Sequence, residues 1–387
     1  MPVAELPRGL AGVVVADTEL TEVRGQEGFY NYRQYSAIEL AENRTFEDVW
    51  HLMVYGELPD TARRRSFTER TAELRRLPTA VSAALPAIAE ACAPSGPLAG
   101  LRTALSLVGA SAGFDPVYDL TADERRHDTL AASAAVPTLL AALHRLGAGQ
   151  QPVEPRDDLP HVANYLYMLT GEEPEPARAR AIEQYMISTI DHGFNSSTFT
   201  GRVIASTGAD VAACLVGAIG ALSGPLHGGA PSRALDAIDE IGSVENIEPY
   251  VRGKVLAGER IMGFGHAVYR VEDPRSRMLR GIAQALADKP RERQLVDLAI
   301  EVERRTLSIL AELKPGRALA TNVELFAGVV MELCGLPRSM FTPTFAAARV
   351  VGWSANIIEQ AADSKIIRPA AHYTGPAPPQ PVPAVSD

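Results

Sequence analysis

Four short segments of this chain carry the residue types that acid–base chemistry on a small acidic molecule requires. In the first, GPLHGG, His227 lies among glycines directly after an apolar stretch. Glycines allow sharp turns and close approach of the backbone to a ligand, and N–H groups at a helix end attract anions. The segment therefore predicts a histidine that faces a cavity. The alternative is a tight turn with an incidental histidine.

The second segment, RIMGFGHAVYRVEDPR, brings one titratable ring and two fixed cations into a short span. His266 follows a Gly-Phe-Gly turn, and Arg270 and Arg275 come shortly after it. A guanidinium can bind a carboxylate through two parallel hydrogen bonds, so the cluster fits a small polycarboxylate. It is not a dinucleotide-binding fingerprint, because the third glycine and a preceding strand signal are missing. The alternative is a surface loop whose arginines pair with Glu272 and Asp273.

Two further segments are less specific by themselves. DHGFNSSTFT places His192 and a run of hydroxyls inside a helical pattern, where a lone histidine is usually a hydrogen-bonded core residue. In TNVELFAG, Thr321 or Asn322 is typical of a helix N-cap, which puts Glu324 in the first helical turn. An acid at that position is normally a surface residue favoured by the helix dipole.

The composition limits the partners of these segments. The 387 residues include 37 Lys and Arg against 47 Asp and Glu, a formal net charge of −10. We expect no nucleic-acid partner and no membrane partner, because both attract clustered positive charge. Three distant cysteines form no ligand spacing, so neither a disulfide scaffold nor a metal site is expected. The N-terminus lacks a targeting pattern, and the longest apolar run is shorter than a membrane span of roughly 20 residues, which predicts a cytoplasmic protein.

Helical periodicity dominates the rest of the chain. One long segment repeats its apolar residues at helical spacing, a charged one keeps a thin apolar stripe, and two more are apolar almost all round. These predicted helices are residues 294–314, 61–77, 209–222 and 343–361, in that order. Strand signals are confined to 13–15 and 29–32, with residues 25–28 as a turn between them. The pattern predicts an all-α fold with a minor N-terminal β-structure.

Together the four segments resemble the citrate synthase family. GPLHGG, GFGHAVYRVEDPR and NVELFAG are similar to the three catalytic stretches of that family, in the same order and at similar spacing. GLAGVVVADTELTEV near the start and IIRPAAHYTGP near the end are similar to the family as well. The resemblance runs from Gly9 to Pro376, and residues 77–174 are the least distinctive part.

The resemblance implies an all-α homodimer with two domains per subunit. A large helical domain would comprise residues 1–229 and 331–387, and a small domain of residues 230–330 would close over the substrate. The family joins the methyl carbon of acetyl-CoA to the keto carbon of oxaloacetate and then hydrolyses the citryl thioester. The implied partners are oxaloacetate and an acyl-CoA. No metal and no cofactor are implied, because acetyl-CoA is a co-substrate.

The resemblance also implies a role for each matching residue. Glu324 would be the base, a neutral His227 with its tautomer fixed by a backbone partner would donate to the thioester oxygen, and His266 would donate to the keto oxygen. The implied oxaloacetate-binding residues are His192, Arg275, Arg349 and, from the other subunit, Arg368. The implied CoA-binding residues are Arg260, Ile261, Met262, Gly263 and Gly265, with Lys314 and Arg317 as candidates for the phosphates.

One position departs from the family pattern. The family usually has Asp where this chain has Glu324, and the extra methylene moves the carboxylate by roughly 1 Å, a misplacement that can cost about 10²-fold in rate. Two alternatives therefore stay open. One is a 2-methylcitrate synthase that uses propionyl-CoA, because an apolar pocket discriminates one methylene of an acyl chain by only about 1–3 kcal/mol. The other is a catalytically weak binding protein of the same fold, because of Glu324. Retention of the histidines and arginines argues against the second.

Overall fold

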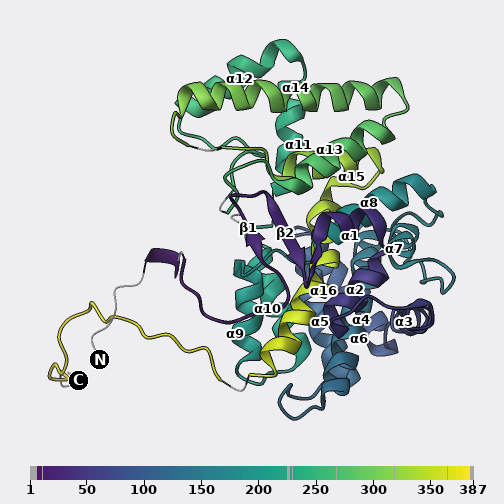
Figure 1. Cartoon of the computed structure of the whole chain (residues 1–387). Coiled ribbons are helices and arrows are strands. Elements are labelled where there is room, and N and C mark those ends of the chain that lie inside the picture. The colour runs from purple at the N-terminus through teal and green to yellow at the C-terminus, as the bar shows by residue number, and fades with distance from the viewer. Residues whose placement is uncertain are drawn as a thin grey trace.

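The computed structural model describes residues 7–10, 12–224, 227–228, 230–266, 268–317, 319–363 and 365–383. Within these residues the chain is mainly helical (Figure 1). The α-helices are α1 (Ala37–Asn43), α2 (Phe46–Tyr55), α3 (Thr61–Glu73), α4 (Thr79–Cys92), α5 (Pro97–Ala112), α6 (Ala122–Gly147), α7 (His161–Thr170), α8 (Pro176–Ser188), α9 (Ser196–Ala205), α10 (Val211–Leu222), α11 (Ala230–Ile241), α12 (Ile247–Leu256), α13 (Pro274–Leu286), α14 (Pro290–Leu313), α15 (Val323–Leu333) and α16 (Phe341–Gln360). The strands are β1 (Val23–Arg24), β2 (Phe29–Tyr32) and β3 (Tyr35–Ser36), and short 3₁₀ helices occupy Arg8–Leu10, Val244–Asn246 and Arg338–Met340. The predicted all-α class is confirmed.

The helices that border the candidate site begin at side chains that cap them. Asn195 Oδ1 accepts from the backbone N–H groups of the first turn of α9, and Asp210 does the same for α10. Asp273 caps α13 and Asn322 caps α15. Such caps satisfy donors that have no partner inside the helix, so the local sequence determines where each helix begins.

The four helices predicted from periodicity are present as α14, α3, α10 and α16. Helix α16 is buried along nearly its whole length, including Arg349, which is 2% exposed. Helix α10 differs from the prediction of a fully buried helix. It buries one face and leaves the other, made of small and apolar residues such as Ala213 and Val216, half-buried.

The predicted strand at residues 13–15 is wrong. These residues are unpaired and Val14 is 83% exposed. The first strand is β1, which pairs antiparallel with β2 through Val23 and Tyr30, and β3 extends the sheet on the other side of β2. The turn between β1 and β2 explains the difference, because a tight turn pairs the residues directly before it and leaves the more distant valines without a partner.

The apolar interior has two parts. One cluster extends through most of the helices and includes Trp50, Phe326 and Trp353. A second, smaller cluster contains Ile247, Val302 and neighbours and lies between α12 and α14. Helices α11 to α14 gather at one end of the molecule, whereas α16 runs through the other part, and β1 and β2 lie where the two parts meet (Figure 1). The domain boundaries at residues 230 and 330 stay a prediction.

One helix in the described part of the chain, α6, is long and apolar enough by length and composition to cross a membrane. Its most apolar window is 72% buried inside the fold. The core helix of a globular domain passes the same test. In α6, Val136 and Leu139 are fully buried in the main apolar cluster.

Candidate active site

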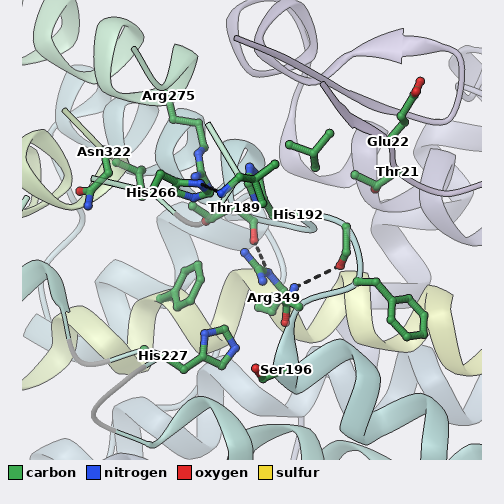
Figure 2. A pocket seen from close by; sticks show the side chains of 18 of the residues that line it. Thr21, Glu22, Thr189, His192, Ser196, His227, His266, Arg275, Asn322 and Arg349 are labelled. Atoms are coloured by element: carbon green, nitrogen blue, oxygen red, sulfur yellow. Dashed lines mark hydrogen bonds between the residues drawn. The ribbon is translucent and has the colours of Figure 1, made fainter. Parts of the chain in front are cut away.

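A cavity of about 780 Å³ lies between the N-terminal segment, the ends of several helices and the middle of α16 (Figure 2). Six of the residues implied as catalytic or oxaloacetate-binding line it: His192, His227, His266, Arg275, Glu324 and Arg349. They come from segments separated by up to 157 positions in the chain, and the fold brings all six to one cavity.

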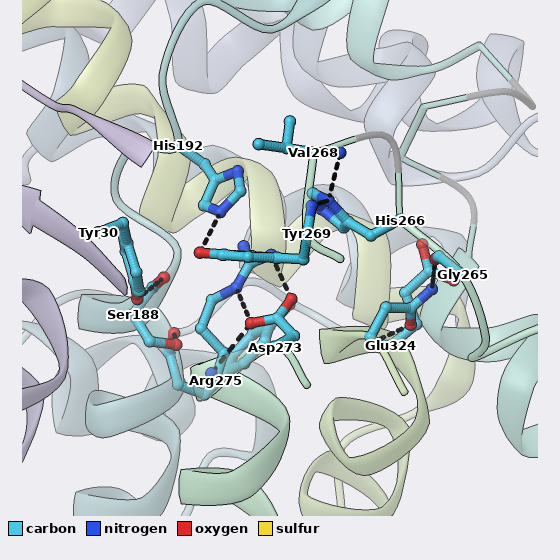
Figure 3. Close-up of polar contacts among 12 residues, drawn as sticks. Tyr30, Ser188, His192, Gly265, His266, Val268, Tyr269, Asp273, Arg275 and Glu324 are labelled. Carbon is cyan, nitrogen blue, oxygen red and sulfur yellow. Dashed lines mark hydrogen bonds and ion pairs between the residues drawn. The ribbon is translucent and has the colours of Figure 1, made fainter. Parts of the chain in front are cut away.

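The backbone of its own loop holds His266. The N–H groups of Val268 and Tyr269 both donate to its Nδ1, at 2.9 and 3.1 Å (Figure 3). Because Nδ1 accepts twice, the ring proton is on Nε2 in the neutral ring. Burial, and then the nearby Arg275 charge, lowers the pKa of His266 to about 4. The ring is therefore a neutral Nε2–H donor at pH 7.

A side chain contacts the ring of His227, and the backbone partner implied by the resemblance stays a prediction. Its Nε2 lies 2.8 Å from Oγ of Ser197, a fully buried residue of α9. Trp353 donates its indole N–H to the same Oγ at 3.2 Å. The hydroxyl proton of Ser197 then has two acceptors, Nε2 of His227 and Oδ1 of Asn195 at 2.7 Å. Burial, and then Arg349, lowers the pKa of His227 to about 4, so this ring is also neutral.

His192 contacts the loop that carries His266. Its Nε2 lies 3.0 Å from the hydroxyl of Tyr269, and its ring centroid is 5.4 Å from that of His266 (Figure 3). Burial lowers the pKa of His192 well below its ordinary value, and the positive charge of Arg275 adds to this effect. All three histidines of the cavity are therefore neutral hydrogen-bonding groups near pH 7.

Glu324 lies in the first turn of α15. Oδ1 of Asn322 accepts from the Glu324 N–H at 3.0 Å, so Asn322 is the N-cap, one of the two residues predicted for that position. Burial raises the pKa of Glu324 to about 7, although Arg275 opposes the shift. A carboxylate with this pKa is matched to general-base catalysis near neutral pH.

The two arginines of the cavity differ in their partners. Arg275 donates from Nε and Nη2 to the two carboxylate oxygens of Asp273, at 3.0 and 2.7 Å. Burial disfavours its charge, but Asp273 outweighs burial and raises the pKa of Arg275. Arg349 instead donates from Nε to the carbonyl of Thr189 at 2.7 Å and forms no ion pair with a described carboxylate. Its guanidinium lies 4.6 Å from the Phe345 ring centroid and lines the cavity.

The remaining predicted residues lie elsewhere. Arg368 is exposed in the extended segment that follows α16 and does not line the cavity of its own chain. Arg260, Ile261 and Met262 line a separate cavity of about 220 Å³. Gly263 and Gly265 have positive φ angles of 85° and 84° on the loop that leads to His266. Lys314 and Arg317 follow the end of α14.

Two polar residues that support the site were not found from the sequence. Ser197 and Tyr269 each contact a proposed site residue directly. Asp273 was named only as an ion-pair partner in a surface loop; it does pair with Arg275, but both residues are buried. The partners of Ser197 and Tyr269 are 30 and 77 positions away in the chain. Among the described residues no group of three or more His, Cys, Asp or Glu is arranged to hold a metal ion.

A carboxyl group with a pKa near 7, neutral hydrogen-bond donors and two cations share one cavity, an arrangement that can move protons on an anionic molecule. Comparisons with known proteins agree. The sequence model described as "Citrate synthase, C-terminal domain" matches residues 9–370. A citrate synthase of Deinococcus radiodurans is 37% identical over 375 residues, which is 96% of each chain.

Solved structures give the same result. Citrate synthase from Thermotoga maritima matches with a TM-score of 0.85 and 34% identity over 97% of this chain and 98% of that one. A ternary complex of carboxymethyl coenzyme A and oxaloacetate with citrate synthase from Thermoplasma acidophilum matches with a TM-score of 0.89 and 28% identity over 98% of both chains. The chain belongs to the citrate synthase family, and it is a transferase of the citrate synthase type. The 2-methylcitrate alternative is not favoured.

Proposed function

We propose that this chain condenses acetyl-CoA with oxaloacetate and hydrolyses the resulting citryl-CoA to citrate and CoA. The observation that carries the proposal is the arrangement of Glu324, neutral His227 and neutral His266 around one cavity that also contains two arginines. The presence of both substrate types in the Thermoplasma acidophilum complex supports this pair of substrates.

Enolisation of the thioester would be the first step. Glu324 accepts a proton from the methyl carbon, and the C–H electron pair forms the new C=C bond while the carbonyl electrons move to oxygen. A carboxylate alone is too weak a base for this step, so a donor must stabilise the enolate oxygen. His227 supplies that donor from Nδ1 when Ser197 gives its hydroxyl proton to Nε2.

Carbon–carbon bond formation would follow. The enolate carbon attacks the keto carbon of oxaloacetate, and the keto oxygen gains the electron pair of its π bond. The Nε2–H of His266 donates a hydrogen bond that stabilises that oxygen, because its Nδ1 is already occupied by two backbone donors. The oxygen then gains a proton in place of the one that Glu324 took from the methyl group, and Glu324 returns to its carboxylate form. Water then cleaves the citryl thioester, supplying the hydroxyl of the new carboxyl group and the proton of the released thiol.

Binding of oxaloacetate would use the two arginines and His192. Among the described residues, the hydrogen bond of Arg349 is from Nε to the Thr189 carbonyl, so both terminal nitrogens can bind a carboxylate. In the same part of the chain Asp273 engages Nε and Nη2 of Arg275, which leaves Nη1 for the substrate. His192 adds a neutral hydrogen bond. For CoA, we propose contacts with residues 260–265 and with Lys314 or Arg317. No cofactor enters the proposed reaction, and the proposed location is the cytoplasm.

A homodimer with shared active sites is part of the proposal. The half-buried face of α10, which includes Ala213 and Val216, offers a surface for a second subunit, and Arg368 would reach the partner's cavity. Mixing an inactive His266→Ala chain with an inactive Arg368→Ala chain should restore activity in heterodimers, because one of their two sites is intact. No recovery after verified subunit exchange would remove Arg368 from the shared site.

The experiment that tests the reaction is release of CoA thiol from acetyl-CoA and from propionyl-CoA, each with oxaloacetate. We expect faster turnover with acetyl-CoA and no release without oxaloacetate. Faster turnover with propionyl-CoA would instead identify a 2-methylcitrate synthase, and no release from either would identify a binding protein.

A further inference from the structure

The loop that carries His266 lies between two supports. On one side, the segment before α15 holds it through backbone bonds. Gly265 N–H donates to the Ala320 carbonyl at 2.8 Å, and Asn322 N–H donates to the Gly263 carbonyl at 3.0 Å. These contacts stabilise the part of the loop before His266. The same segment also binds the far end of the loop, where the Asp273 N–H donates to the Thr321 carbonyl at 3.3 Å, but these bonds do not involve residues 268–270.

The turn between β1 and β2 supports the part of the loop after His266. The Arg270 N–H donates to the Gly25 carbonyl at 2.9 Å. At Gly25 the approach is so close that a Cβ atom would lie 2.2 Å from the carbonyl oxygen of Val268 and 2.7 Å from its carbonyl carbon. The φ angle of Gly25 is outside the left-handed region. The absent side chain is therefore required by this contact and not by the conformation of the turn.

The supported residues are the ones that bind the His266 ring. Val268 N–H and Tyr269 N–H donate to Nδ1, and the Tyr269 hydroxyl contacts Nε2 of His192 (Figure 3). Movement of the Val268 peptide would therefore change the orientation of His266 and the site of its ring proton. We propose that Gly25 is a positioning residue, which fixes the orientation and the Nε2–H tautomer of His266 by direct backbone contact with residues 268–270.

Gly25→Ala tests this inference, which rests on the proposed function only for its rate measurement. The Val268 carbonyl would have to move by roughly 1 Å to accommodate the methyl group, and a displacement of that size can cost about 10²-fold in rate. We expect kcat to fall about 10- to 100-fold with the KM for acetyl-CoA nearly unchanged. The ¹⁵N chemical shifts of the His266 ring should change from a single Nε2–H tautomer to a mixture.

Gly253→Ala is the matched control. Gly253 lies in α12, and an added Cβ would have no heavy atom within 4 Å, so neither kcat nor the His266 signals should change. A folded Gly25→Ala enzyme with wild-type kcat and an unchanged His266 tautomer would overturn the inference. If wild-type protein releases no CoA, the proposed function fails, whereas the ¹⁵N comparison still decides the role of Gly25.

A second measurement does not depend on how well the variant folds. In the wild-type protein, the Arg270 amide should exchange with solvent at least about tenfold more slowly than in an unstructured peptide, because Gly25 accepts its hydrogen bond. Exchange of the Arg270 amide at the unstructured rate would show that the contact does not persist, and the inference would be wrong.

Discussion

The two walls of the cavity hold their polar side chains in different ways. On the wall made by α9 and α16, distant partners hold the side chains. His227 depends on Ser197, and Arg349 depends on the carbonyl of Thr189, which is 160 positions away. On the opposite wall, partners are close in sequence. His266 is held by the N–H groups of Val268 and Tyr269, and Glu324 follows its own N-cap.

A second difference, in the kind of group that holds the ring, separates His266 from His227 and affects how each responds to substitution. Where the backbone holds a side chain, a change in a neighbouring side chain leaves the donor in place, and only a backbone shift moves the ring. Where a side chain holds it, one substitution removes the donor and leaves a buried group without a partner, at a cost of about 1–3 kcal/mol. The predictions below separate direct roles in the reaction from these supporting roles.

The largest effect is expected for Glu324→Gln, on the wall whose side chains are held by residues close in sequence. The substitution keeps size and hydrogen bonding but removes the proton acceptor, so kcat should fall by about 10²–10⁴. The KM for oxaloacetate should change little, because the carboxylate acts on the acyl-CoA. Glu332→Gln, on the same helix, is the control and should retain wild-type kcat. Unimpaired turnover and unimpaired exchange of the acetyl-CoA methyl protons in Glu324→Gln would refute the base assignment.

The two arginines should differ in what their loss does. Arg275→Leu and Arg349→Leu should each weaken oxaloacetate binding by roughly 2–5 kcal/mol, measured as an increase in KM. Arg275→Leu should also lower the free energy of unfolding by about 3–5 kcal/mol, because it leaves Asp273 buried at 0% exposure without its partner. Arg277→Leu, an exposed change on the same helix, should affect neither quantity. Wild-type KM values in both site variants would exclude them as carboxylate binders.

The same contrast explains how far the sequence predicted this site. The wall held by nearby residues could be predicted, since glycines beside His266 and the N-cap before Glu324 are local features. The periodicity of α14 and α16 likewise predicted helices, because the spacing of apolar residues along the chain indicates whether one face or all faces of a helix are buried. The support from Ser197 could not be predicted, because no local pattern specifies a partner 30 residues away. The roles of Glu324 and the histidines in turnover were predicted from the resemblance to the family and not from the local pattern.

A smaller effect is expected for Ser197→Ala, on the wall made by α9 and α16, where distant partners hold the side chains. Loss of the hydroxyl leaves His227 Nε2 and the Trp353 indole N–H without their partner. The cost of about 1–3 kcal/mol corresponds to a decrease in kcat of about 5- to 150-fold, because no hydroxyl proton is left to favour the Nδ1–H tautomer of His227. The exposed Ser223→Ala is the control, since its Oγ donates to the Gly220 carbonyl within its own helix end. A decrease in thermal stability with wild-type kcat would limit Ser197 to packing.

The smallest effect is expected from a change of pH. The pH dependence of kcat/KM tests the role of Glu324 in the wild-type protein, without any substitution. Burial raises the pKa of Glu324 to about 7, and a general base is active only when deprotonated. The rate kcat/KM for acetyl-CoA should therefore rise about tenfold per pH unit below 7 and level off above it. His227 and His266, each with a pKa lowered to about 4, stay neutral through this range and add no further step. The residual activity of Glu324→Gln should lose the rise near pH 7. A rise that persists in Glu324→Gln would assign the titration to another group and leave Glu324 without the role of base.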